Sequence, residues 1–146
     1  MQGTGRVVGL MILVFAFATL ATAQDRSEIH KRLAEVAQHV KQVKDPAAKR
    51  ALLDDTFRQL TDVVNQASQG PLATASDQAA LKVLGRNIQD KRDELNGKNG
   101  FRRVDDARLN SFADYSMQDL EQADQWVYIS TGTIILIVLL ILLLRV

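Results

Sequence analysis

The side chains that most often do chemistry in proteins are sparse in this chain and poorly spaced for a shared site. His30 and His39 are nine positions apart, which places them on opposite sides of a helix that turns about 100° per residue. Histidine pairs that bind zinc are typically three or four positions apart on one helix face. We therefore interpret both histidines as surface residues and predict no metal site.

Acidic side chains occur in adjacent pairs, at Asp54 and Asp55, at Asp93 and Glu94, and at Asp105 and Asp106. Adjacent residues on a helix point in different directions, so such pairs make poor two-carboxylate sites. The sequence also lacks a G-x-S-x-G nucleophile turn, a glycine-rich phosphate loop and the spacing of an EF-hand. It predicts a protein that is not an enzyme and has no catalytic residues and no cofactor.

The absence of cysteine and the balance of charges exclude further classes of site and partner. The chain has no cysteine, so it has no disulfide, no thiolate zinc site and no lipid-carrying cysteine of the bacterial lipoprotein type. Without Arg6 and Arg145 at the ends, the chain has 16 basic and 17 acidic residues. Such a balance provides no net basic surface, so we expect no nucleic-acid partner.

The beginning of the chain is typical of a secretory signal. Arg6 is followed by an apolar run from Val7 to Leu20, and small side chains stand at Ala21 and Ala23, where signal peptidase requires them. The sequence predicts a cleaved signal peptide over residues 1–23. The alternative is an uncleaved first membrane helix, because the run approaches the length that spans a bilayer.

The end of the chain predicts a transmembrane helix over residues 126–144. Residues 127–144 carry no charge, and as a helix they would extend about 27 Å, close to the hydrocarbon thickness of a bilayer. Trp126 and Tyr128 flank the span on one side and Arg145 on the other, where aromatic and basic residues typically lie at membrane surfaces.

A glycolipid-anchor signal is an alternative for this tail, because such signals also end in a hydrophobic run. Its cut site would fall at Ser116, which is followed by Met117 and Gln118 instead of the small residues required. Signal and anchor together predict a single-pass protein of the plasma membrane or bacterial inner membrane. Residues 24–125 would lie outside the cytoplasm and residues 145–146 inside it.

The region between these ends has the periodicity of amphipathic helices. Its apolar residues recur at alternating spacings of three and four, the a and d pattern by which helices pack against each other in coiled coils and bundles. The stripes comprise Ile29, Leu33, Val36, Val40 and Val43; Leu53, Phe57, Leu60, Val64 and Ala67; Leu81, Leu84, Ile88 and Leu95; and Leu109, Phe112, Ser116, Leu120, Ala123 and Val127. We expect an all-α antiparallel bundle of three to four helices.

Breaks between the predicted helices fall at Asp45 and Pro46, at Gly70 and Pro71, and at Asn96 and Gly97. Residues 102–131 contain neither glycine nor proline. We therefore expect the fourth helix to continue without interruption into the transmembrane helix. Basic residues prevail in the first helix and acidic ones in the fourth, which favours the two as neighbours.

These features predict a non-enzymatic structural or accessory subunit of a membrane complex, held by the bilayer and by protein partners, with self-association possible. Small side chains at Ser130, Gly132 and Thr133 are the candidate contacts to a membrane partner, because they permit close helix approach. The alternative function is an extracytoplasmic sensor or carrier that binds a ligand or lipid inside the bundle. Gly85 and Lys91, which interrupt the third stripe, would line that site.

Overall fold

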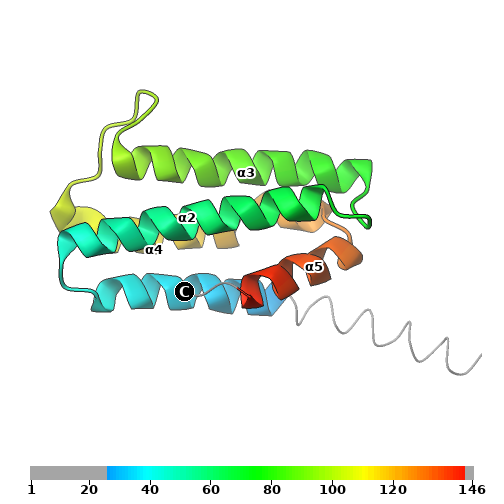
Figure 1. Cartoon of the computed structure of the whole chain (residues 1–146), viewed down its shortest axis with the longest axis horizontal. Coiled ribbons are helices and arrows are strands. Elements are labelled where there is room, and N and C mark those ends of the chain that lie inside the picture. The colour runs from blue at the N-terminus through cyan, green and yellow to red at the C-terminus, as the bar shows by residue number, and fades with distance from the viewer. Residues whose placement is uncertain (1–25, 144–146) are drawn as a thin grey trace, which may run out of the picture.

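The computed structural model describes residues 26–143, and every regular element in this part of the chain is a helix. The elements are an N-terminal helix over residues 26–42, α2 (Pro46–Ser68), α3 (Ala75–Asn96), α4 (Leu109–Glu121) and α5 (Thr131–Leu142), with short 3-10 helices η1 (Asp106–Arg108) and η2 (Asp124–Tyr128). The first four helices lie side by side and α5 lies against the end of this bundle (Figure 1). The predicted all-helical bundle is confirmed. The predicted signal peptide, residues 1–23, lies outside the described residues, as does Arg145.

Local sequence signals explain where these helices begin and end. The Asp45 carboxylate accepts a hydrogen bond from the backbone N–H of Ala48 at 2.9 Å, and Pro46 occupies the first turn of α2. Thr74 opens α3 as its N-cap, and Gly97 ends it with a φ of 68°, a left-handed conformation that glycine adopts without a steric penalty. The predicted breaks between these helices are therefore confirmed.

The predicted apolar stripes form the core. Ile29, Leu33, Val36 and Val40 of the N-terminal helix are buried, as are all the predicted stripe residues of α2, α3 and α4. Phe57 of α2 and Phe112 of α4 meet edge to face, with ring centroids 6.3 Å apart. The N-terminal helix and α4 are joined by an ion pair between Lys41 Nζ and Asp114 Oδ1 at 2.7 Å, which agrees with the expected pairing of the first and fourth helices.

The end of the bundle away from α5 is held by Arg50. Its guanidinium donates hydrogen bonds to the backbone carbonyl of Val104 at 2.6 Å, to Asp106 at 2.9 Å and to the carbonyl of Leu95. This side chain thereby connects α2, the end of α3 and the loop that precedes α4. The segment before α4 is therefore held by a side chain of α2.

The prediction of one continuous helix from α4 into a membrane span is wrong for the described residues. α4 ends at Glu121, residues 124–128 form η2, and α5 starts again at Thr131. The indole N–H of Trp126 donates to the carbonyl of Leu120 at 2.7 Å, which satisfies a carbonyl at the end of α4. The turn allows α5 to bury one face against the bundle. None of the helices within residues 26–143 has both the length and the apolar character needed to cross a bilayer.

Candidate functional site

The candidate site is the apolar groove in which α5 lies. The groove is formed by the N-terminal helix, α2 and α3, and α5 closes it over a small internal void of about 20 Å³. Around this void the three helices contribute Ile29, Leu33, Leu60, Val63, Val64, Leu84 and Ile88, and Leu120 of α4 and Trp126 of η2 complete the lining beside α5. The groove therefore binds one helix, which in this structure is α5 of the same chain.

One face of α5 enters the groove. Thr133, Ile134, Ile137, Val138 and Ile141 are buried, and their spacing of three and four positions places them on one side of the helix. Four of these five side chains are aliphatic and β-branched. The contact is thus apolar along most of its length, with one polar residue near the start of α5.

Polar contacts converge on Asp77 at the start of α5. One carboxylate oxygen of Asp77 accepts the backbone N–H of Ser130 at 2.7 Å. The other accepts the hydroxyls of Ser130 at 2.6 Å and Thr133 at 2.8 Å, and the backbone N–H of Thr74 at 3.0 Å. Asp77 thus belongs to the capping box of α3 and also binds the beginning of α5. Its negative charge suits the positive end of both helix dipoles.

These contacts determine the ionisation of Asp77, whose side chain is only 1% exposed. Burial by itself raises the pKa of this carboxyl, because it disfavours the charged form. The hydrogen bonds from Ser130, from the Thr74 backbone and from Thr133 stabilise the carboxylate more strongly and lower its pKa from 3.8 to about 2. Asp77 is therefore an ionised anchor for α5 at neutral pH.

The first turn of α5 packs closely on the loop between α2 and α3. A Cβ atom at Gly132 would lie 3.7 Å from Cβ of Leu72, and one at Gly70 would lie 3.0 Å from Cδ2 of Leu136. Disulfides join Cβ atoms about 3.5–4.5 Å apart, so cysteines at Leu72 and Gly132 match this spacing. Because the chain has no cysteine of its own, such a bond would form without competing thiols.

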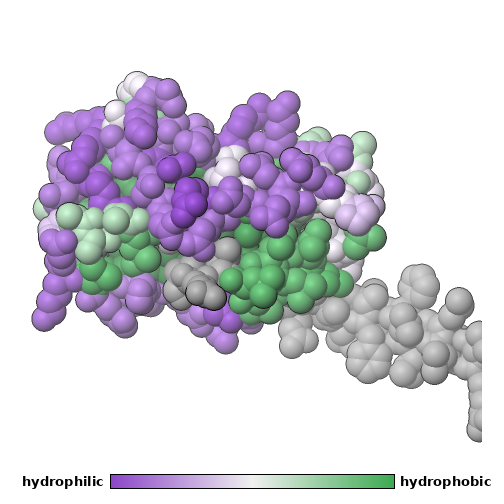
Figure 2. Space-filling model, viewed as in Figure 1, coloured by the Kyte–Doolittle hydropathy of each residue, from purple (hydrophilic) through white to green (hydrophobic). Residues whose placement is uncertain are grey.

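The face of α5 that points away from the groove is also apolar. Ile135, Leu139, Leu142 and Leu143 are exposed, with Leu139 at 54% and Leu143 at 77%. Hydrophobic side chains gather over α5 in Figure 2, whereas the surface over α2 and α3 is largely hydrophilic. A surface helix normally has a polar outer face, so α5 differs from every other helix of the bundle.

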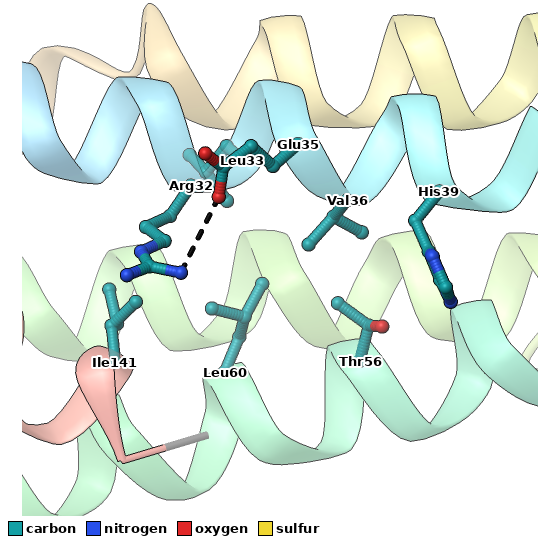
Figure 3. Close-up of a pocket in the computed structure, with 8 residues that line it drawn as sticks. All are labelled: Arg32, Leu33, Glu35, Val36, His39, Thr56, Leu60 and Ile141. Atoms are coloured by element: carbon teal, nitrogen blue, oxygen red, sulfur yellow. Dashed lines mark hydrogen bonds and ion pairs between the residues drawn. The ribbon is translucent and has the colours of Figure 1, made fainter. Parts of the chain in front are cut away.

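A second cavity lies beside the last turn of α5. Next to Ile141, the N-terminal helix and α2 line a cavity of about 180 Å³. In Figure 3, Val36 and Leu60 project into the space between the two helices, and Arg32, Glu35 and His39 border it. Arg32 is paired with Glu28 at 3.1 Å and with Glu35 at 3.4 Å.

The predicted contact residues Ser130, Gly132 and Thr133 come together at the start of α5. They contact the chain's own bundle, through Asp77 and Leu72. Of the predicted membrane flanks, Trp126 packs partly against the core and Tyr128 is 67% exposed. Asp77 is the functional residue that sequence reasoning missed, because its partners Ser130 and Thr133 lie 53 and 56 positions away in the sequence.

The residues expected to line a ligand site have other contacts. Nζ of Lys91 lies 2.6 Å from the hydroxyl of Tyr115 and 3.1 Å from Asp119. A Cβ at Gly85 would lie 3.5 Å from Cγ1 of Val64, an ordinary packing distance. Both residues therefore serve contacts between helices in this structure.

His30 and His39 are both exposed, as expected for surface residues. Among the adjacent acids, Asp54 binds Arg92, with its Oδ1 2.9 Å from Nε, and accepts from Asn96 at 2.7 Å. The hydrogen bond from Arg92 lowers the pKa of Asp54. This carboxylate thus joins α2 to α3.

Comparison with known proteins returned no match to a protein-family model, a curated protein or a solved structure.

Proposed function

We propose that this chain is a non-enzymatic accessory protein of a membrane complex, in which α5 leaves the groove and residues 126–144 span the bilayer. The single observation that carries the proposal is that α5 is apolar on both faces. Its inner face is buried, whereas Ile135, Leu139 and Leu142 are exposed to water in the isolated chain. A helix that is apolar around its circumference is typical of a protein core or a membrane.

The transfer free energy of the exposed aliphatic side chains supports this role. An aliphatic side chain gains about 1.5–3 kcal/mol when it leaves water for an apolar medium, and docking in the groove leaves several such side chains only partly buried. Residues 127–144 are uncharged and as one helix would reach about 27 Å. An extended helix of this length would place both faces of α5 in hydrocarbon.

Alkaline extraction of membranes tests the anchor. We expect the full chain to stay with the membrane at high pH, as integral proteins do. A variant with Ile135→Lys and Leu139→Glu alters only the outer face of α5 and should be released. The matched control places the same charges at Ala34 and Gln38, which are both exposed on the N-terminal helix, and should behave like the wild type. Release of the wild-type chain by alkali would contradict the proposal.

Native mass spectrometry of the detergent-extracted chain tests the accessory role. Co-purifying protein subunits in fixed ratio are expected. A lone chain with a bound small molecule would instead favour the sensor or carrier, the alternative predicted from the sequence.

A further inference from the structure

We propose that an arginine-lined cavity at the start of α4 binds an acidic peptide segment of a partner protein. The cavity has a volume of about 480 Å³ and lies between the loop after α3 and the first turns of α4. In Figure 1 this loop projects from the end of the bundle away from α5. The inference rests on the proposed accessory role, because a chain anchored through residues 126–144 would present this end to other proteins, away from the bilayer.

Three guanidinium groups border the cavity, those of Arg102 and Arg103 from the loop and that of Arg108 from η1. Among residues 26–143, the guanidinium groups of Arg102 and Arg108 have no ion pair or hydrogen bond. Arg103 lies 4.0 Å from Asp106, whose carboxylate is already bound by Arg50 at 2.9 Å. Guanidinium groups bind carboxylates through paired hydrogen bonds, so these arginines are available to acidic residues of a partner.

The loop that carries two of these arginines is fixed before anything binds. Gly97 has a φ of 68°, and a Cβ there would lie 2.7 Å from Cβ of Arg103, so a larger residue would clash. The Asn99 side chain donates to Asp93 at 2.8 Å, and Arg50 binds the carbonyl of the residue after Arg103 at 2.6 Å. A site that is ordered in advance loses less conformational entropy when it binds.

Aromatic residues complete the surface. Phe112 and Tyr115 of α4 line the cavity, with ring centroids 6.4 Å apart, and Tyr115 is 50% exposed. Nζ of Lys91 lies 4.0 Å from the centroid of the Tyr115 ring and 2.6 Å from its hydroxyl, which holds the ring in place. Phe101 on the loop is also exposed. Arginine and aromatic residues contribute most of the binding energy in many protein interfaces.

The acidic side chains of the cavity favour a peptide over a phosphate-bearing ligand. Glu94 and Asp105 also line it, and they would repel the dense negative charge of a phosphate group or a nucleic-acid strand. A peptide carries its carboxylates apart and has backbone N–H groups that can donate to Glu94 and Asp105. The arginines and the two acids can therefore both be paired by one acidic peptide.

A second copy of this chain fits less well as the occupant. Its acidic residues near the end of α4, such as Asp119 and Glu121, lie at the opposite end of that helix from the cavity. Two copies anchored side by side in one membrane would keep these ends apart. We therefore assign the cavity to an acidic segment of a different protein.

The probe is a fluorescent peptide of alternating Asp and Gly residues, and a peptide of alternating Asn and Gly is its uncharged control. Anisotropy with the full chain in detergent, at low ionic strength, should show binding of the acidic peptide alone. Arg102→Gln combined with Arg108→Gln should weaken this binding by about tenfold or more, because two charge-assisted contacts are lost. Both arginines are exposed, so circular dichroism of this variant should match that of the wild type.

The matched control is Lys82→Gln combined with Arg86→Gln, which removes the same charge from the exposed face of α3. It should bind the acidic peptide as the wild type does. Equal weakening by both double variants would show that only overall charge matters and would overturn the site. Absence of binding, or equal binding of the uncharged peptide, would overturn it as well.

Two further results separate this inference from its alternatives. Displacement of the acidic peptide by inorganic phosphate at a lower concentration than by unlabelled peptide would assign the cavity to a phosphate ligand and contradict the proposal. If alkali releases the wild-type chain from membranes but the peptide binds through Arg102 and Arg108, the peptide site stands and only the membrane role fails. A membrane-retained chain that does not bind the peptide would reject the site and leave the anchor intact.

Discussion

α3 and α5 are both packed helices of one chain, yet they are built for different surroundings. α3 buries one stripe, exposes polar residues such as Lys82 and Arg86, and is capped at both ends by Thr74 and Gly97. α5 is apolar on both sides and is attached through polar contacts only at its first turn. The difference teaches that α3 is built to pack on one face and to meet water on the other, whereas α5 is apolar on the face that it exposes as well.

Helix length strengthens this contrast. α5 has 12 residues, and isolated helices shorter than about 12–15 residues are marginal in water. α5 therefore depends on its surroundings for stability. The groove supplies them by burying one face, and a bilayer would supply them by enclosing both.

Replacing Phe57 by Ala tests the core of the helical bundle and should have the largest effect on stability. Phe57 is fully buried and packs on Phe112, so the cavity should lower the free energy of unfolding by about 3–5 kcal/mol. Chemical denaturation followed by circular dichroism measures this change. A loss below about 1 kcal/mol would show that the bundle core is not the source of stability.

Asp77→Asn tests how α5 is attached to the bundle. The amide cannot accept the same charge-assisted hydrogen bonds from Ser130 and Thr133, and bonds to a charged group contribute about 1.5–3 kcal/mol each. We expect the local opening free energy of α5 to fall by about 2 kcal/mol, measured by hydrogen exchange at Ile137 and Val138. Asp62→Asn, on the exposed face of α2, is the matched control and should leave α5 exchange unchanged.

Acid should loosen α5 through the same carboxylate. Asp77 has a pKa of about 2 when docked against an ordinary value of 3.8. Because the docked value is the lower one, the stabilisation is present above the ordinary value and is lost as the pH falls through 3.8 toward 2. The part that belongs to α5 comes from Ser130 and Thr133, since the hydrogen bond from Thr74 remains when α5 opens. Hydrogen exchange of α5 across this range, compared with the Asp77→Asn chain, measures the effect. Equal acid sensitivity of both chains would contradict the role of Asp77.

Gly85→Ala should have the smallest effect and the opposite sign. A methyl group at this position of α3 meets Val64 at an ordinary distance, and alanine favours a helix over glycine by up to about 1 kcal/mol. The unfolding free energy should rise by about 0.5–1 kcal/mol, with α5 exchange unaffected. Destabilisation would reveal a closer contact between α2 and α3 than the structure has.

The bundle could be predicted from the sequence because its signals are local. Stripes such as Leu53, Phe57 and Leu60 indicate which helix face is buried. Pro46 and Gly97 mark helix ends through their own backbone preferences. No long-range information was needed for these elements. Arg50, which fixes the loop before α4, could not be identified in this way because its partners lie 45 to 56 positions away.

The turn before α5 and the role of Asp77 could not be predicted for a related reason. Nothing between Glu121 and Ser130 forbids a helix. The break is stabilised by a local contact of Trp126 with Leu120 and by the long-range contact of Ser130 with Asp77. Asp77 and Ser130 are 53 positions apart. An apolar run indicates that a segment avoids water. Burial in a groove and insertion into a bilayer both remove its side chains from water, so the run alone does not distinguish them.

The most direct test of the account is alkaline extraction of the Leu72→Cys, Gly132→Cys chain after mixing with liposomes, in its reduced and oxidised forms. The reduced chain can release α5 and should remain with the lipid at high pH. The oxidised chain holds α5 in the groove and should be extracted, while both single-cysteine chains treated with the same oxidant should behave like the reduced form. Retention of the oxidised chain to the same extent as the reduced chain would contradict the exchange of α5 between groove and bilayer.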